Sequence, residues 1–137
     1  MIKSFYASLS QLPAMLDFIQ HQAVAMGFPE LQISKIVLAA EEVVVNVISY
    51  GYPEGSEGII EIECQPHLIG GIDIIIRDDG IPYNPLANTF NLTFTPESPI
   101  EHGKIGGFGI LVVLRMMDKV TYRYENGRNV LILEKYL

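Results

Sequence analysis

The stretch SKIVLAAEEVVVNVISYGY, at residues 34–52, carries the strongest structural signal in the sequence. Apolar residues occupy most of its circumference at helical spacing, which predicts a long and largely buried helix. At about 100° per residue, Glu42, Asn46 and Ser49 form one narrow polar stripe on this helix, and Glu41 lies to its side. Because a carboxylate is costly to bury, the stripe is expected to face either a polar partner element or a pocket for a charged ligand.

The totals describe a single acidic domain. The chain has 137 residues, 49% of them hydrophobic, and a formal net charge of −7. These values predict one folded domain over residues 1–137 and argue against disorder and against direct binding to a nucleic-acid backbone. No apolar run reaches the ~20 residues that span a membrane, and the first residues do not resemble a signal peptide. The single cysteine, Cys64, fits a reducing cytoplasm.

Periodicity and turn signals predict the other elements. They are strands at residues 2–8, 59–65, 72–77, 120–124 and 130–136, and helices at residues 11–26 and 110–117. Ser10 is expected to cap the first helix and Gly27 to end it. The order β α α β β α β β is typical of an α+β fold, here a two-layer sandwich with helices on one face of a mixed, mostly antiparallel sheet.

Glu42 and Asn46 are the first candidate site. One reading is a polar patch that hydrogen-bonds a loop. The other is a carboxylate placed as a general base, with an amide oxygen one turn away that suits Mg²⁺.

The segment Asp78-Asp79-Gly80-Ile81-Pro82 is the second candidate site. An aspartate at the end of a central strand, with little bulk at Gly80, suits an acceptor for the amino group of a base whose ring lies against the glycine. The same residues also favour an ordinary strand-ending turn.

A glycine-rich segment, Gly103-Lys104-Ile105-Gly106-Gly107-Phe108-Gly109, is the third candidate site and precedes the expected helix at residues 110–117. Glycines let backbone N–H groups approach a phosphate at a helix N-terminus, and Lys104 adds a mobile cation. The alternative is a flexible linker, since the segment matches neither a Walker loop nor a Rossmann turn.

Taken in order, the three candidates resemble the boxes of the GHKL ATPase superfamily, which has a Bergerat-type ATP-binding fold. EEVVVNVISYGYP is similar to the N-box, DDGIPYNP to the adenine box, and GGFGILVVLRMMD to the glycine box with its following helix. The branch that the chain resembles most is the anti-sigma-factor serine kinases.

The resemblance implies a role for each matched residue. Glu42 would be the general base and Asn46 the Mg²⁺ ligand. Asp78 would bind the adenine amino group, with Gly80 giving the ring room. Gly106, Gly107, Gly109 and Lys104 would hold the phosphates of ATP, and residues from about 83 to 105 would form an ATP lid.

The chain also departs from the family pattern at several positions. Tyr50 stands where relatives often have His, and Tyr83 and Asn84 replace Phe and Asp. The final hairpin reads Gly127-Arg128-Asn129 where many relatives place a Thr near the adenine, which puts that contact in doubt. The expected lid contains no Arg.

The resemblance predicts a cytoplasmic, ATP-dependent serine/threonine protein kinase that acts as a homodimer. Its substrate would be a serine of an anti-sigma-factor antagonist protein, and it would hold a sigma factor in an alternative complex. A non-catalytic, ATP-gated protein-binding regulator is the main alternative, and the detached catalytic domain of a histidine kinase is another.

Overall fold

The computed structural model describes residues 1–53, 57–87 and 105–137, with the backbone alone for residues 105–108. Its elements follow the order predicted from the sequence. They are β1 (Ile2–Tyr6), a 3-10 helix (Leu9–Gln11), α1 (Leu12–Ala25), α2 (Glu30–Gly51), β2 (Ile59–Pro66), β3 (Gly71–Asp78), α3 (Ile105–Met116), β4 (Lys119–Glu125) and β5 (Arg128–Tyr136). Within the described ranges, no helix is long and apolar enough to cross a membrane.

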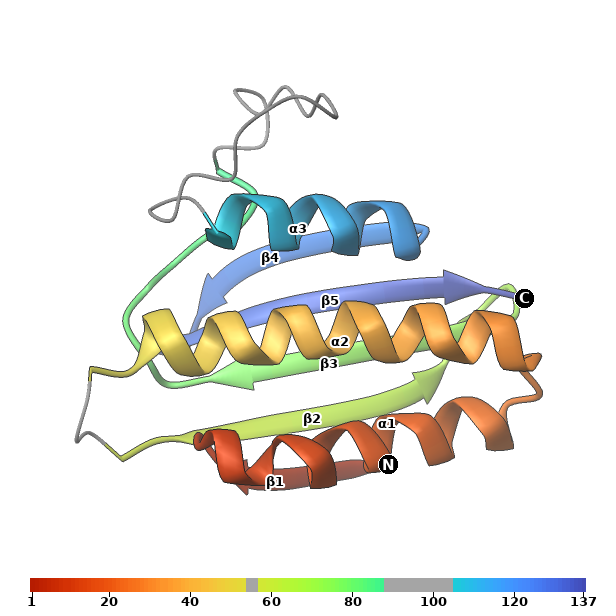
Figure 1. Ribbon diagram of the computed structural model, residues 1–137, viewed down its shortest axis with the longest axis horizontal. Helices are drawn as coiled ribbons and strands as arrows, with labels where there is room; N and C mark the ends of the chain where they lie inside the picture. The colour runs from red at the N-terminus through yellow and green to blue at the C-terminus, as the bar shows by residue number, and fades with distance from the viewer. Residues whose placement is uncertain (54–56, 88–104) are drawn as a thin grey trace.

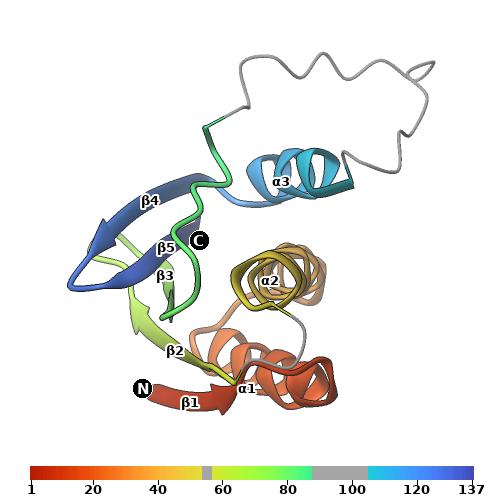
Figure 2. The ribbon, with the colours of Figure 1, turned by 90° about the vertical axis from the view of Figure 1, so that its left-hand side faces the viewer.

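The five strands form one sheet in the order β1-β2-β3-β5-β4, and every neighbouring pair is antiparallel. All three α-helices cover the same face of this sheet, with α2 in the middle (Figures 1 and 2). The predicted α+β sandwich is therefore confirmed, with a sheet that is antiparallel throughout. Because β5 lies between β3 and β4, the end of the chain borders the central strand that carries Asp78.

The alternation in β2 sorts its side chains between core and solvent as the period of two predicts. Ile60 and Ile62 are fully buried under the helices. On the other face, Arg77 of β3 pairs with Glu61 and Glu63 at 2.9 and 3.0 Å. Cys64 is also buried on the helix side, and this burial raises the pKa of its thiol to about 12. The register of the sheet is thus fixed by one apolar and one charged face.

The first two α-helices differ from the expectations in three respects. Ser10 does not cap α1, because the side chain of Ser8 accepts from the Ser10 N–H and caps the 3-10 helix instead. The central helix begins at Glu30 and not at residue 34, and it is amphipathic and not largely buried. Its exposed side carries Leu31 and Leu38, which are 67% and 42% exposed.

The third helix also differs, since α3 begins at Ile105 and not at residue 110. The glycines at 106, 107 and 109 therefore lie in its first turns and not in a loop before it. Glycine is unfavourable in a helix by about 1 kcal/mol relative to alanine, so the local sequence favours a loop. Packing of α3 against α2 overrides this preference.

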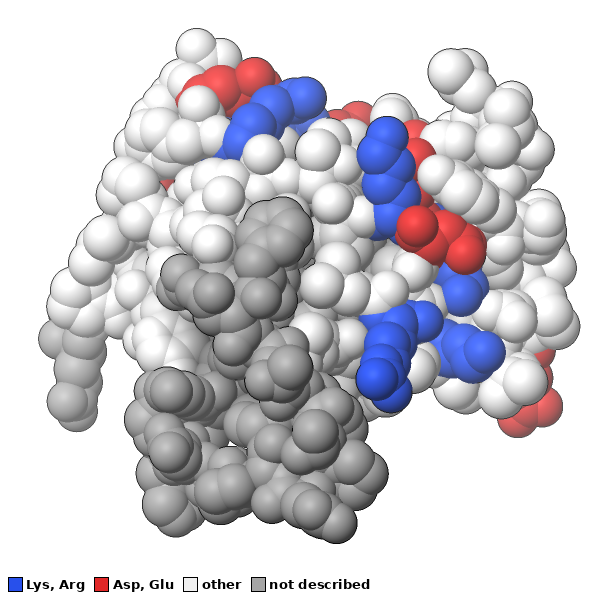
Figure 3. Space-filling view, turned by 90° about the horizontal axis from the view of Figure 1, so that it is seen from above, with Lys and Arg blue, Asp and Glu red and all other residues white. Residues whose placement is uncertain are grey.

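The face of the molecule seen from above carries mixed charges. Basic and acidic side chains lie beside one another in small groups among uncharged residues, and residues outside the described ranges are grey (Figure 3).

Candidate functional site

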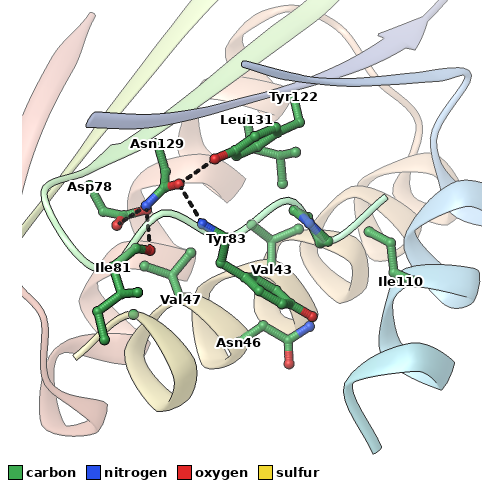
Figure 4. A pocket seen from close by; sticks show the side chains of 12 residues that line it. Val43, Asn46, Val47, Asp78, Ile81, Tyr83, Ile110, Tyr122, Asn129 and Leu131 are labelled. Atoms are coloured by element: carbon green, nitrogen blue, oxygen red, sulfur yellow. Dashed lines mark hydrogen bonds between the residues drawn. The ribbon is translucent and has the colours of Figure 1, made fainter. Parts of the chain in front are cut away.

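A pocket lies between α2, α3, β5 and the segment that follows β3 (Figure 4). It is open on one side, and its empty space, counted with the part open to solvent, is about 460 Å³. Its wall is mostly apolar, with Val43, Val47, Ile110 and Leu131 among the lining residues, and Asn46 and Asp78 supply polar groups. A mostly apolar pocket with few polar groups is the usual form of a site for a small organic ligand.

Asp78 ends β3 inside this pocket and is only 4% exposed. Its Oδ1 accepts hydrogen bonds from the Gly80 N–H at 2.9 Å and from Asn129 Nδ2 at 3.0 Å. No donor from the described residues reaches its second oxygen, Oδ2. Burial raises the pKa of Asp78, although these two hydrogen bonds oppose the effect. The carboxylate thus has one oxygen fixed by the protein and one available to a ligand.

Asn129 of β5 is the residue that holds this corner together. It is 6% exposed. Its Nδ2 also donates to the Ile81 carbonyl at 3.0 Å, and its Oδ1 accepts from the Tyr83 N–H at 3.0 Å and from the Tyr122 hydroxyl (Figure 4).

Gly80 lies against the end of α2. A Cβ at Gly80 would stand 2.5 Å from the carbonyl oxygen of Gly51 and 2.9 Å from Asp78 Oδ1. The same Gly51 carbonyl accepts from the Ile81 N–H at 2.9 Å. A side chain at residue 80 would therefore push apart the helix and the segment that follows β3, and only glycine allows this approach.

Glu42 and Asn46 lie one turn apart on α2 and face α3. A Cβ at Gly109 would stand 2.7 Å from Glu42 Oε2 and 3.4 Å from Asn46 Nδ2. Both polar side chains are half-buried, and neither makes a hydrogen bond or ion pair with a described residue. The absence of a side chain at Gly109 leaves room for these two groups, and their unpaired oxygens are the hard donors that Mg²⁺ prefers.

Two hydrogen bonds between Tyr52 and Asp79, here called the latch, link α2 to the segment after β3. The Tyr52 hydroxyl donates to Asp79 Oδ1 and accepts from the Asp79 N–H at 3.1 Å. The bond from Tyr52 is the main reason why the pKa of Asp79 lies below its usual value, and burial raises the pKa of Tyr52. The latch ties the residue after α2 to the residue after β3, next to the site.

The remaining predicted residues belong to the third box. Gly106 and Gly107 lie in the first turn of α3, where backbone N–H groups have no partner inside the helix. Lys104 lies outside the described residues, as does most of the expected lid. The structure therefore brings Glu42, Asn46 and Gly109 together, and it places Asp78 at the pocket that Asn46 also lines. Gly80 does not line the pocket itself but lies beside Asp78 and Gly51.

A family model, described as the histidine kinase-like ATPase domain, matches residues 5–135. The chain belongs to this family. A solved histidine kinase domain, from a blue-light activated histidine kinase of Erythrobacter litoralis EL346, is similar to this ATPase domain in fold. The TM-score is 0.56 at 14% sequence identity, and the match covers 93% of this chain and 60% of the solved one.

Two relatives of this histidine kinase-like ATPase domain have names that describe a function. An anti-sigma F factor of Clostridium novyi (strain NT) is 28% identical over 106 residues, which is 76% of this chain and 71% of the relative. A serine-protein kinase RsbW of Oceanobacillus iheyensis is 28% identical over 117 residues, with 82% and 70% covered. The predicted family resemblance is thus confirmed.

Three departures from the family pattern meet within this ATPase domain. The rings of Tyr50 and Tyr83 lie with their centroids 5.9 Å apart, and Asn129 accepts from the Tyr83 N–H. The sequence placed Asn129 within a departing stretch, Gly127-Arg128-Asn129, and indicated no role for it. The signal that could have identified it is a polar residue directly before the apolar run of β5 at residues 130–133.

Proposed function

We propose that this domain is an ATP-dependent protein serine kinase of the anti-sigma type. The observation that carries the proposal is the meeting of Glu42 and Asn46 with Gly109, beside a pocket whose far wall holds Asp78. Adenine would lie against Asp78 and Gly80, with its amino group donating to Asp78 Oδ2. The phosphates would then reach the N-terminal turn of α3, where free N–H groups and the helix dipole favour negative charge.

Glu42 would act on the acceptor serine. It takes the proton of the serine hydroxyl, whose oxygen bonds to the γ-phosphorus as the bond to the bridging oxygen of ADP breaks. General base catalysis of this kind contributes typically ~10²–10⁴ in rate. Asn46 would hold Mg²⁺, which when bound neutralises charge on the phosphate oxygens. The charge and position of the Glu42 carboxylate are the parts of this step that the protein itself supplies.

The names of the relatives, anti-sigma F factor and serine-protein kinase, support the partner proteins proposed for this domain. We propose that the acceptor serine belongs to an anti-sigma-factor antagonist, that a sigma factor is the alternative partner, and that the kinase works as a homodimer in the cytoplasm. Lys104 and the residues of the lid would complete the phosphate site.

The test compares a variant at Glu42 with a variant at the neighbouring Glu41. Glu42→Gln should leave the affinity for ADP nearly unchanged, because the adenine end is untouched, and should abolish transfer of phosphate from ATP. Glu41→Gln is the matched control, since Glu41 is exposed and lies on another side of α2. Transfer is measured as phosphate on serine by mass spectrometry, with an antagonist protein from the same genome as acceptor.

The outcomes separate the possibilities. Equal transfer by Glu42→Gln and the wild type would remove Glu42 from its role. ADP binding without any transfer by the wild type would overturn the kinase and leave a nucleotide-gated binding domain. The absence of ADP binding would overturn the nucleotide site itself.

A further inference from the structure

The Asn129 amide has no capacity left for a ligand. Its two N–H groups donate to Asp78 Oδ1 and to the Ile81 carbonyl, and its oxygen accepts from the Tyr83 N–H and the Tyr122 hydroxyl. An asparagine side chain offers two donors and one oxygen with two lone pairs, so every position is used. Asn129 lines the pocket, but a side chain whose hydrogen bonds are all used serves to fix its neighbours and not to hydrogen-bond the base.

The bond to Asp78 determines which oxygen the pocket presents. Asn129 and the Gly80 N–H both hold Oδ1, at 3.0 and 2.9 Å, so the carboxylate cannot rotate without losing two hydrogen bonds. Oδ2 is then the acceptor that remains for an amino group. Hydrogen bonds to a charged group are stronger than neutral ones, which makes this orientation stable before any ligand arrives.

The other bonds of Asn129 fix the wall of the pocket. They hold the carbonyl of Ile81 and the N–H of Tyr83, so the segment after β3 is tied to β5 at two points. Ile81 and Tyr83 both line the pocket. One side chain therefore sets both the direction of the carboxylate and the position of the wall that lies next to it.

We infer that Asn129 is the positioning residue of the base-binding end of this site, which holds Asp78 and the residues 81–83 in their binding arrangement without a hydrogen bond of its own to the nucleotide. This inference rests on the proposed function, since it assumes that the pocket takes an adenine nucleotide. It assigns to this chain a direct hydrogen bond between Asn129 and Asp78, made from the stretch 127–129 in which the family resemblance implies a threonine.

The test is Asn129→Asp, which keeps the shape and removes both donors. The new carboxylate would lie about 3 Å from Asp78 Oδ1, and two acids at this distance share one proton, so that one pKa of the pair rises strongly. Below that pKa the shared proton restores a donor to Asp78. Above it, both groups are charged and repel each other, so ADP affinity should fall as pH rises.

The measurement is the dissociation constant of ADP by isothermal titration calorimetry from pH 6 to 9. We expect Asn129→Asp to bind about tenfold more weakly than the wild type at pH 8.5, with the ratio narrowing toward pH 6. The titratable neighbours do not interfere in this range, because the pKa of Asp79 is lowered and that of Tyr122 is raised from 10.0.

Two further variants make the result specific. Asn126→Asp adds the same charge in the exposed turn before β5 and should bind ADP like the wild type at each pH. Asn129→Ser is shorter and neutral, so it should weaken ADP binding by a similar factor at every pH. This variant also provides a test if Asn129→Asp does not fold.

The outcomes distinguish the inference from the function on which it rests. If the wild type does not bind ADP, the proposed function fails. If the wild type binds ADP and either variant of Asn129 binds it as tightly as Asn126→Asp at every pH, the positioning role is overturned while the nucleotide site stands. A loss of affinity in Asn129→Asp that does not change with pH would also contradict the role.

Discussion

Replacing Gly109 with alanine tests the contact between α2 and α3 that the proposed chemistry needs. The new methyl would stand 2.7 Å from Glu42 Oε2, and the carboxylate must move by roughly 0.7 Å to reach the 3.4 Å of ordinary contact. Since Glu42 is a flexible side chain, the shift should cost ~1 kcal/mol of rotamer strain. Alanine is more favourable than glycine in a helix by ~1 kcal/mol, so the stability of the folded protein should hardly change.

Catalysis should respond much more strongly than stability. A misplacement of about 1 Å in a reacting group can cost ~10²-fold in rate, so we expect Gly109→Ala to lose between about tenfold and a hundredfold in phosphate transfer. Its affinity for ADP should fall less, because the Asp78 end of the pocket is unchanged. The assay is phosphate on the acceptor serine over time, beside ADP titrations of both proteins.

A double-mutant cycle identifies the cause. In a Glu42→Ala background the methyl meets no carboxylate, so Gly109→Ala should stabilise the protein by ~1 kcal/mol more than it does in the wild type. Urea unfolding measures both differences. The reasoning is refuted if the two substitutions add without coupling, or if Gly109→Ala transfers phosphate at the wild-type rate.

Three other substitutions test the opposite end of the site. Asp78→Asn keeps an oxygen for the Gly80 N–H and should weaken ADP binding by at least about tenfold. Because burial raises the pKa of Asp78, the wild type should become more stable to urea relative to this variant as the pH falls through that pKa toward 3.8. Tyr52→Phe removes the hydrogen bond to Asp79, which is exposed, and should lower the free energy of unfolding by ~1 kcal/mol near neutral pH. Since the pKa of Asp79 is lowered, this difference should persist above about pH 4 and vanish as the pH falls below the lowered pKa. Thermal unfolding at several pH values would check this. Gly80→Ala would bring a methyl to 2.5 Å from the Gly51 carbonyl and should destabilise the protein by ~1–3 kcal/mol; an unchanged melting temperature would contradict the close approach.

The parts of the fold that local patterns specify could be predicted from the sequence. The alternation of Ile and Glu in β2 fixed which face is buried, and the spacing of Glu42 and Asn46 placed both on one side of α2. Two adjacent glycines between strand-like runs, Gly70 and Gly71, also indicate a turn, and the structure places both at positive φ, 100° and 131°. Each of these features depends on neighbours within a few residues of one another.

The parts that depend on distant contacts could not be predicted. Asn129 and Asp78 are 51 positions apart, and nothing near either residue in the sequence indicates the bond. The glycines before residue 110 are helical because α3 packs against α2. Local helix preferences do not include this contact, so they did not predict it. The exposed side of α2 was missed because an apolar sequence does not say which of its residues a sheet will cover.

A cluster of three residues also depends on contacts between distant parts of the sequence. His67, Asp73 and Glu134 meet on the outer face of the sheet, with His67 Nδ1 2.6 Å from Asp73 Oδ1 and 3.4 Å from Glu134 Oε1. The strand pairing of Asp73 with Glu134 creates this cluster. From the sequence alone, His67 is only a residue in a turn.

The position of β5 also determines when the site can exist during synthesis. Asp78 and the helix with its acid and amide are made first, but Asn129, which orients Asp78, follows 51 residues later. A nascent chain emerging from a ribosome therefore has no finished base pocket until residue 129 is free to pair with β3. Nucleotide can therefore stabilise the chain through this pocket only after β5 has joined the sheet.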